Sequence, residues 1–417
     1  MIIPRDRYLK QLVSSKGNRM IKIITGIRRC GKSFLLFELF HKHLNDAGVE
    51  DSHIIEIALD DRENITLRNP DNLLTYIKHK ITDGEQYYVL LDEVQLVEDF
   101  VGVLNSLLHI RNVDTFVTGS NSKCLSKDVV TDFRGRGQDI HIYPLSFSEY
   151  FNAADENINT AWKNYYTFGG LPQTLLFKEV KEKADYLQHL ADTVYINDVI
   201  ERHKIRNRAE LRELLQIIAS SIGSPCNPTK LSKTFKSLKN ITISNKTLTN
   251  YLDYLCDAFM VERAIRYNIK GKKYINTLSK YYFTDLGLRN ALLDFRQIEQ
   301  PHIMENIIYN ELLYRGYSVD VGIVEMTGHD KDGKFIRKQF EVDFVVNTAD
   351  RRFYIQSAFA IPDEAKMLQE TASFRNIDDS FKKIIIVKDD IMPYTDDTGF
   401  YHIGLFDFLL NAELTQP

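Results

Sequence analysis

The chain has 417 residues, enough for two to four domains. Hydrophobic residues make up 44% and charged residues 26%, as in ordinary globular proteins, and no apolar run approaches the roughly 20 residues that span a bilayer. The formal net charge is −4, but residues 201–294 carry about 17 Lys and Arg against about 8 Asp and Glu. These numbers argue against a membrane partner and indicate a basic segment, suited to an anion, within an acidic chain.

The four cysteines are widely spaced and form no CxxC pair, and the N-terminal residues contain no apolar signal-peptide core. We therefore expect reduced thiols and a cytoplasmic location.

The first strong motif is Gly-Ile-Arg-Arg-Cys-Gly-Lys-Ser at residues 26–33, between a β-branched run and an amphipathic helical pattern. Strand, GxxxxGK[ST] loop and helix in this order predict a phosphate-binding P-loop. We expect Lys32 to contact the β- and γ-phosphates of ATP and Ser33 to hold Mg²⁺. The predicted nucleotide-binding residues are Gly26, Ile27, Arg28, Arg29, Cys30, Gly31, Lys32, Ser33 and Phe34.

A second motif, Tyr-Tyr-Val-Leu-Leu-Asp-Glu-Val-Gln, occupies residues 87–95. Its unbroken apolar run predicts a strand buried on both faces, which ends in two carboxylates. With a P-loop upstream, this pattern is typical of a Walker B strand. Asp92 is then expected to bind Mg²⁺ and Glu93 to polarise the attacking water.

Two further positions, each with an alternative residue, are weaker candidates. Asn121, or Ser120, follows a strand at residues 115–118 and would lie beside the γ-phosphate, or else cap the next helix. Arg136, less favourably Arg134, would contact the γ-phosphate in cis or act as an arginine finger in trans, or else belong to a solvated basic loop.

A helical lid is predicted at residues 151–207, after an ATPase domain at residues 1–150. Within it lies Phe-Gly-Gly-Leu-Pro, ending at Pro172. By analogy with STAND-type ATPases, Pro172 is interpreted as a contact to the adenine ring; the alternative is a simple helix-breaking turn.

A winged helix is predicted at residues 208–295, with its recognition helix at 248–259 and a Lys-rich hairpin tip at 268–273. Double-stranded DNA would be contacted within residues 230–273, since phosphates bind Lys and Asn side chains. Packing of the winged helix on its own ATPase domain is the alternative. The candidate DNA contacts are Asn245, Lys246, Asn250, Lys270, Lys272 and Lys273.

The sequence pattern of residues 296–417 predicts a final α/β domain. Two strands, at residues 339–346 and 353–358, are arranged like the metal-binding strands of PD-(D/E)xK nucleases, whose carboxylates hold a divalent cation. The lysine of that pattern is missing, because Ala358 stands at its position, and Lys366 is the conceivable substitute. We therefore expect a degenerate nuclease-like domain with a vestigial metal site formed by Glu305, Glu341, Asp343 and Gln356.

Taken together, these motifs show that the chain resembles bacterial and archaeal AAA+/STAND-like P-loop ATPases. Those proteins carry a winged helix and a C-terminal domain related to PD-(D/E)xK nucleases. The matching segments include T-G-I-R-R-C-G-K-S, Y-V-L-L-D-E-V-Q, F-G-G-L-P and E-V-D-F. The resemblance implies a multidomain α/β fold: an AAA+-like domain with a five-stranded parallel sheet, the lid, the winged helix and a restriction-endonuclease-like domain. It also implies binding of ATP with Mg²⁺ and slow hydrolysis.

The leading hypothesis is an ATP-driven switch that positions the winged helix and the degenerate nuclease-like domain on DNA or a protein partner, in a chain able to form oligomers. One alternative is an active metal-dependent nuclease, which the missing lysine argues against. Another is an ATP-binding scaffold with little turnover, which Glu93 argues against.

Overall fold

The computed structural model describes residues 2–119, 135–239, 241–329, 335–361 and 363–411. The chain divides into two compact units: the first contains residues 1–145, 171–173 and 257–259, and the second contains the remainder. The main boundary falls at residue 145, close to the predicted end of the ATPase domain. The finer division of the second unit into lid, winged helix and nuclease-like domain stays a prediction. Among the described residues, no helix combines the length and apolar character needed to span a membrane.

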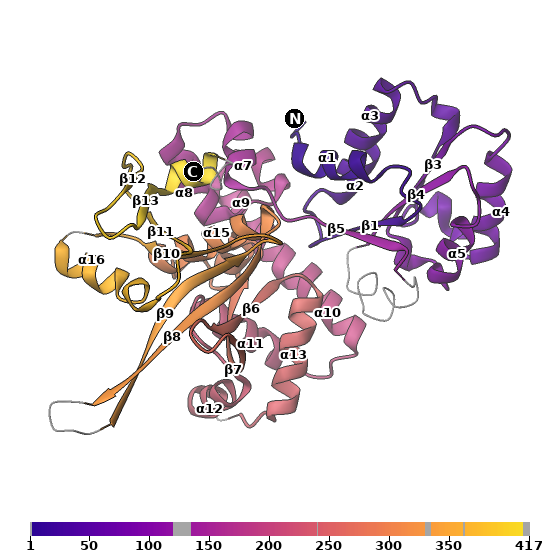
Figure 1. The fold of residues 1–417 in the computed structure, drawn as a ribbon. Helices are drawn as coiled ribbons and strands as arrows, with labels where there is room; N and C mark the ends of the chain where they lie inside the picture. Colours follow the sequence, from indigo (N-terminus) through magenta and orange to yellow (C-terminus); the bar gives the residue numbers. More distant parts are fainter. Residues whose placement is uncertain (1, 120–134, 240, 330–334, 362, 412–417) are drawn as a thin grey trace. The chain divides into compact units, whose positions relative to one another are not determined.

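The first unit is built on a parallel sheet whose strand order is β2-β3-β4-β1-β5 (Figure 1). This confirms the predicted five-stranded parallel sheet. Since β4 lies between β1 and β3, the carboxyl ends of the P-loop strand and the Walker B strand flank that of β4. The strands are β1 (Ile21–Thr25), β2 (Ile54–Ala58), β3 (Tyr87–Asp92), β4 (Val113–Thr118) and β5 (Gly137–His141).

Helices supply the apolar side chains that cover this sheet. Leu73 and Ile77 of α4 pack in one core with Val89 of β3 and Leu104 of α5. Burial of each such side chain contributes about 1.5–3 kcal/mol. The P-loop is followed by one helical run that takes π-type turns at Leu35–Phe40. The helices are α1 (Asp6–Ser15), α2 (Lys32–Phe34), α3 (His41–Asp46), α4 (Pro70–Lys80) and α5 (Phe100–Leu107).

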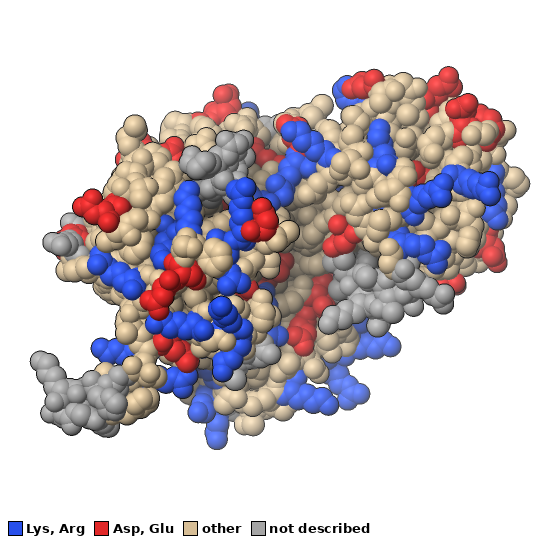
Figure 2. All heavy atoms as spheres, viewed as in Figure 1, with Lys and Arg blue, Asp and Glu red and all other residues tan. Residues whose placement is uncertain are grey.

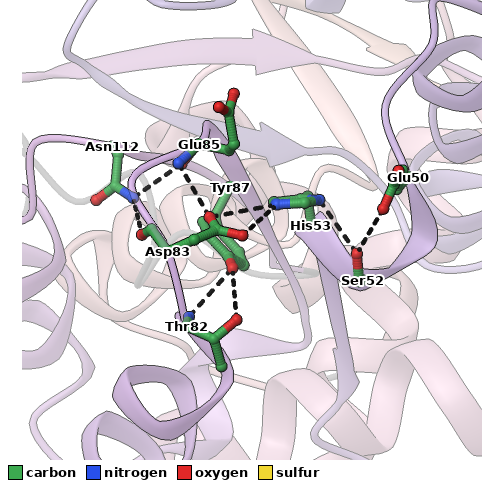
Figure 3. A network of polar contacts seen from close by, with 8 residues as sticks. All are labelled: Glu50, Ser52, His53, Thr82, Asp83, Glu85, Tyr87 and Asn112. Atoms are coloured by element: carbon green, nitrogen blue, oxygen red, sulfur yellow. Dashed lines mark hydrogen bonds and ion pairs between the residues drawn. The ribbon is translucent and has the colours of Figure 1, made fainter.

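A polar network closes the amino-terminal edge of the sheet, where β2, β3 and β4 begin (Figure 3). His53 Nε2 lies 3.1 Å from Asp83 Oδ2, and Asn112 Nδ2 donates to the carbonyl oxygen of Glu85 at 2.8 Å. The Tyr87 hydroxyl accepts from the Thr82 N–H at 3.1 Å. The network joins the loops that enter three neighbouring strands. It lies at the edge opposite the P-loop, which follows the carboxyl end of β1.

The second unit begins with helices. Its first pair packs through Phe147, whose ring meets Trp162 and Tyr165 edge to face; the aromatic stretch of the lid is therefore core. The helices are α7 (Phe147–Ala154), α8 (Ile158–Phe168), α9 (Val180–His189), α10 (Ile196–His203), α11 (Arg208–Ser220), α12 (Pro228–Lys239), α13 (Asn245–Asp257), α14 (Leu286–Leu292), α15 (Gln300–Tyr314), α16 (Glu364–Thr371) and α17 (Leu405–Leu410).

An eight-stranded mixed sheet of order β12-β13-β11-β10-β9-β8-β6-β7 completes the second unit. The predicted hairpin is present as β6 and β7, but it is not a free wing, because β6 also pairs in parallel with β8. The hairpin and the C-terminal strands therefore share one sheet across residue 295. The strands are β6 (Val261–Asn268), β7 (Lys273–Phe283), β8 (Ser318–His329), β9 (Phe335–Asn347), β10 (Arg352–Ala358), β11 (Lys382–Val387), β12 (Tyr394–Thr395) and β13 (Tyr401–Gly404).

Candidate nucleotide site

The loop between β1 and α2 has the backbone of a phosphate-binding turn. Gly26 and Gly31 adopt φ values of 141° and 100°, and Arg29 adopts 64°. A Cβ on Gly26 would lie 2.2 Å from the carbonyl oxygen of Ile142, so that position accepts only glycine.

Lys32 folds back into this loop. Its side chain is buried, and Nζ donates to the carbonyl oxygens of Gly26 at 3.0 Å and Ile27 at 3.1 Å. Both acceptors are neutral, so they leave the positive charge of the ammonium available to a bound anion.

Ser33 lies near Asp92. The Asp92 carboxylate is buried and accepts a hydrogen bond from the Thr118 hydroxyl. Burial raises the pKa of Asp92, and the hydroxyls of Thr118 and Ser33 counteract that effect. A hydroxyl beside a carboxylate is an oxygen donor set that suits Mg²⁺. The predicted pair of metal-binding residues is therefore placed together.

Glu93 occupies a left-handed backbone conformation, with φ of 53°. Its N–H donates to Thr118 Oγ1 at 3.0 Å, and its carboxylate accepts a hydrogen bond from the Gln95 side chain. Thr118 thus contacts both Walker B residues. Sequence reasoning did not select Thr118, although its position, as a polar residue ending the strand next to the Walker B strand, was a usable signal.

A second cluster missed from the sequence lies where β1 and β5 end. Thr25 Oγ1 lies 3.1 Å from both Asp139 Oδ1 and His141 Nδ1. Burial, with a further contribution from the charge of Lys32, lowers the pKa of His141 to about 4. His141 Nε2 is buried and has no hydrogen-bond partner within the described part of the chain. The ring is therefore neutral and lies within the electrostatic reach of the P-loop lysine.

The N-terminal helix region fixes the outer side of the loop. Arg5 donates to the carbonyl oxygens of Cys30 at 3.1 Å and Tyr143 at 2.6 Å, and the Tyr8 hydroxyl accepts from the Tyr143 N–H at 3.0 Å. Pro172 also lies beside the loop, since its Cγ is 4.0 Å from the position that a Cβ on Gly31 would take. An adenine contact by Pro172 stays a prediction.

The structure describes the position of Arg136 but not that of Asn121. The Arg136 carbonyl accepts from the Ile21 N–H at 2.9 Å, at the start of β1 and β5, whereas the P-loop follows their carboxyl ends. Five residues of strand span about 16 Å, so a γ-phosphate contact by Arg136 in cis is not compatible with this placement, and the role in trans stays a prediction. Asn121, Ser120 and Arg134 lie outside the described residues.

The predicted C-terminal residues are brought together, with one addition. Glu341 and Asp343 lie on β9, Gln356 on β10 and Glu305 on α15. Lys280 of β7, which sequence reasoning missed, lies between them: its Nζ is 2.8 Å from Glu305 Oε1 and 2.7 Å from Glu341 Oε1. Among the described residues, no group of three or more His, Cys, Asp or Glu side chains is arranged to hold a metal ion. The only sequence signal for Lys280 was a lysine directly before three aromatic residues, Tyr281, Tyr282 and Phe283.

The basic residues proposed for DNA contact lie on the surface of the second unit. Lys246, Lys270, Lys272 and Lys273 are exposed, and Figure 2 shows Lys and Arg side chains gathered over the end of this unit that carries α12 and α13. Lys270 Nζ lies 3.8 Å from Asp378 Oδ2, and this exposed ion pair is weak.

Comparisons with known proteins identify an AAA domain in the N-terminal part of the chain. Residues 18–151 match the AAA domain family, and residues 159–299 match a domain of unknown function (DUF8612). An uncharacterized protein of Haemophilus influenzae is 33% identical over 415 residues, which cover 98% of this chain and 99% of that protein. An uncharacterized protein of Methanocaldococcus jannaschii is 29% identical and covers 97% of this chain and 88% of its own. Among solved structures, the Aeropyrum pernix ORC1 protein in complex with DNA covers 70% of this chain and 92% of that chain at 11% identity; its TM-score of 0.31 supports no further argument.

Proposed function

This chain belongs to the family of its Haemophilus influenzae relative, with an AAA domain at residues 18–151, and we propose that it is a slow Mg²⁺-dependent ATPase. The observation that carries the proposal is the placement of Lys32, Ser33 and Asp92: an ammonium held by neutral carbonyls beside a hydroxyl and a carboxylate. These groups fit a nucleotide phosphate and its magnesium ion.

Each residue has a role that its position supports. The P-loop N–H groups and Lys32 bind and orient the phosphates, and Ser33 with Asp92 would hold Mg²⁺, which supplies charge neutralisation of the phosphates when bound. The Glu93 carboxylate orients the attacking water by accepting a hydrogen bond from it, and takes up its proton as the water attacks. Arg5 fixes Cys30 and thereby the shape of the loop. Arg136 is left for a role in trans, which requires an oligomer.

The nucleotide state would set the position of the second unit on double-stranded DNA or on a protein partner. The exposed lysines within residues 230–273 support DNA as the first partner to test. A nuclease activity of the C-terminal strands is not proposed, because Ala358 is buried in a hydrophobic core with Tyr354 and Ile385 and offers no charge to a phosphate.

Substitution of Lys32 tests the nucleotide site. Lys32→Ala should abolish measurable ATP binding in calorimetry while the thermal unfolding curve stays close to that of the wild type, because the glycines, not the lysine, shape the loop. Lys42→Ala is the matched control, since Lys42 is exposed and forms an ion pair with Asp46. Unchanged ATP affinity in Lys32→Ala would show that this loop is not the site.

The DNA part has a separate test. ATPase rate and DNA affinity are measured with duplex DNA across a salt series for the wild type and for a Lys270, Lys272 and Lys273 triple alanine variant. Each lost phosphate contact should reduce the slope of log affinity against log salt by about 1. Lys181→Ala on α9 is the control. An unchanged slope would leave a protein partner as the target of the switch.

A further inference from the structure

Glu305, Glu341 and Asp343 form a cluster of carboxyl groups, which we call the acidic cluster. The ammonium of Lys280 lies against this cluster, where a cation would bind. Lys280 is 2% exposed. Its Nζ lies 2.8 Å from Glu305 Oε1 and 2.7 Å from Glu341 Oε1. The Tyr282 hydroxyl donates to the same Glu305 oxygen at 2.6 Å. Such a buried ammonium is retained only when it is paired in this way.

The ammonium also affects the pKa values of the cluster's carboxyl groups. Burial acts to raise the pKa of Glu305, but the charge of Lys280, the nearby His302 and the hydrogen bonds from Lys280 and Tyr282 lower it to about 2. Burial and the charge of Glu305 raise the pKa of Asp343 well above its usual value. The other two carboxylates of the cluster, Glu305 and Glu341, are both engaged by Lys280.

A neighbouring acceptor is left without a partner. Gln356 is 9% exposed, and its Oε1 is buried with no hydrogen-bond partner within the described residues. Gln356 adjoins Ser357, whose N–H donates to Asp343 Oδ2 at 2.7 Å. A buried amide oxygen of this kind is an unused ligand for a hard cation.

We propose that the ammonium of Lys280 is the resident cation of this cluster and occupies the place of a divalent metal ion. The lysine comes from β7, outside the strand β9 and the helix α15 that carry the carboxylates, so another part of the fold supplies the cation. Removal of the ammonium frees two carboxylates, Glu305 and Glu341, and leaves the Gln356 oxygen as a further ligand. A divalent cation such as Mn²⁺ should then bind.

The test is calorimetric titration of Mn²⁺ into nucleotide-free, EDTA-treated full-length protein. Lys280→Met should bind Mn²⁺ at least about tenfold more tightly than the wild type, and the gain should disappear in the double variant Lys280→Met with Asp343→Asn. Lys366→Met is the matched control, since Lys366 pairs with Glu370 at 2.7 Å on α16 and should leave Mn²⁺ binding unchanged.

The proposal is overturned if wild-type protein binds Mn²⁺ as tightly as Lys280→Met does, and equally if a folded Lys280→Met shows no gain. If Lys280→Met is unfolded in EDTA, Mn²⁺ should restore its circular dichroism spectrum and cooperative melting. Failure of Mn²⁺ to restore them overturns the proposal as well. These measurements do not involve ATP, so they are independent of the proposed ATPase.

Discussion

The hydroxyl of Thr118 joins the two carboxylate residues of the Walker B strand: it donates to the Asp92 side chain and accepts from the Glu93 N–H at 3.0 Å. Asp92 is 5% exposed, and Glu93 stands in a left-handed conformation. One threonine at the end of β4 therefore positions a proposed metal-binding group and the backbone of the proposed base. Its effect on activity would act through those residues, so it is a positioning residue.

We predict that Thr118→Val lowers the ATPase rate by about 10–100-fold, as loss of a group that supports a metal-binding residue commonly does. Because Asp92 loses a partner, the Mg²⁺ concentration needed for half-maximal activity should rise. A change confined to thermal stability would mean that Thr118 is only structural. Thr115→Val provides the control, since Thr115 is buried on the same strand.

Glu93→Gln should bind ATP with little change and hydrolyse it about 10²–10⁴-fold more slowly, because the amide cannot accept a proton from water. Binding is measured by calorimetry and turnover by phosphate release. Glu98→Gln, an exposed position on the following loop, is the control. Equal turnover in Glu93→Gln and the wild type would assign the activation of water to another group.

Local patterns were sufficient to predict the first unit. Apolar runs such as residues 87–91 gave the buried parallel strands, and the glycine spacing at residues 26–31 gave the loop whose backbone needs positive φ. The same information predicted Lys32, Ser33 and Asp92 as neighbours, because parallel strands bring their carboxyl ends to one edge.

Long-range side-chain placement could not be predicted in this way. Lys280 reaches Glu341 from a strand 61 residues earlier in the chain, and the pairing of β6 with β8 that merges the hairpin with the C-terminal sheet has no local signature. The missing lysine at Ala358 was correctly noted, but a pattern within one strand pair gives no information on a side chain that enters from another strand.

The stability of the protein should depend on pH through His141. In the folded state its pKa is about 4, whereas histidine in an unfolded chain titrates near 6.5. Between these values the unfolded chain takes up a proton that the folded protein does not. The stabilisation is therefore fully present above pH 6.5 and is lost as the pH falls through 4, by about 3 kcal/mol.

Asp139 acts in the opposite direction. Burial raises its pKa to about 6, so the folded protein takes up a proton here before the unfolded chain does, and its contribution to stability falls as the pH rises from 3.8 to 6. The two effects partly cancel in the wild type. The informative quantity is the difference in unfolding free energy between the wild type and His141→Gln, which should change by about 3 kcal/mol between pH 7 and pH 4. The exposed His79→Gln serves as control, and a constant difference would refute the assignment.

Purified protein should not cleave DNA with Mg²⁺ or Mn²⁺, with or without ATP. Attack on a phosphodiester builds negative charge on a non-bridging oxygen, and loss of the group that meets this charge costs about 3–4 kcal/mol of transition-state stabilisation. Ala358 supplies no such group, and the ammonium of Lys280 is held by Glu305 and Glu341. Supercoiled plasmid is the sensitive substrate, because a single nick changes its mobility. Metal-dependent nicking that persists in the wild type and in Lys366→Met but vanishes in Asp343→Ala would show that the cluster is an active nuclease centre and that Lys280 acts on the phosphate after all.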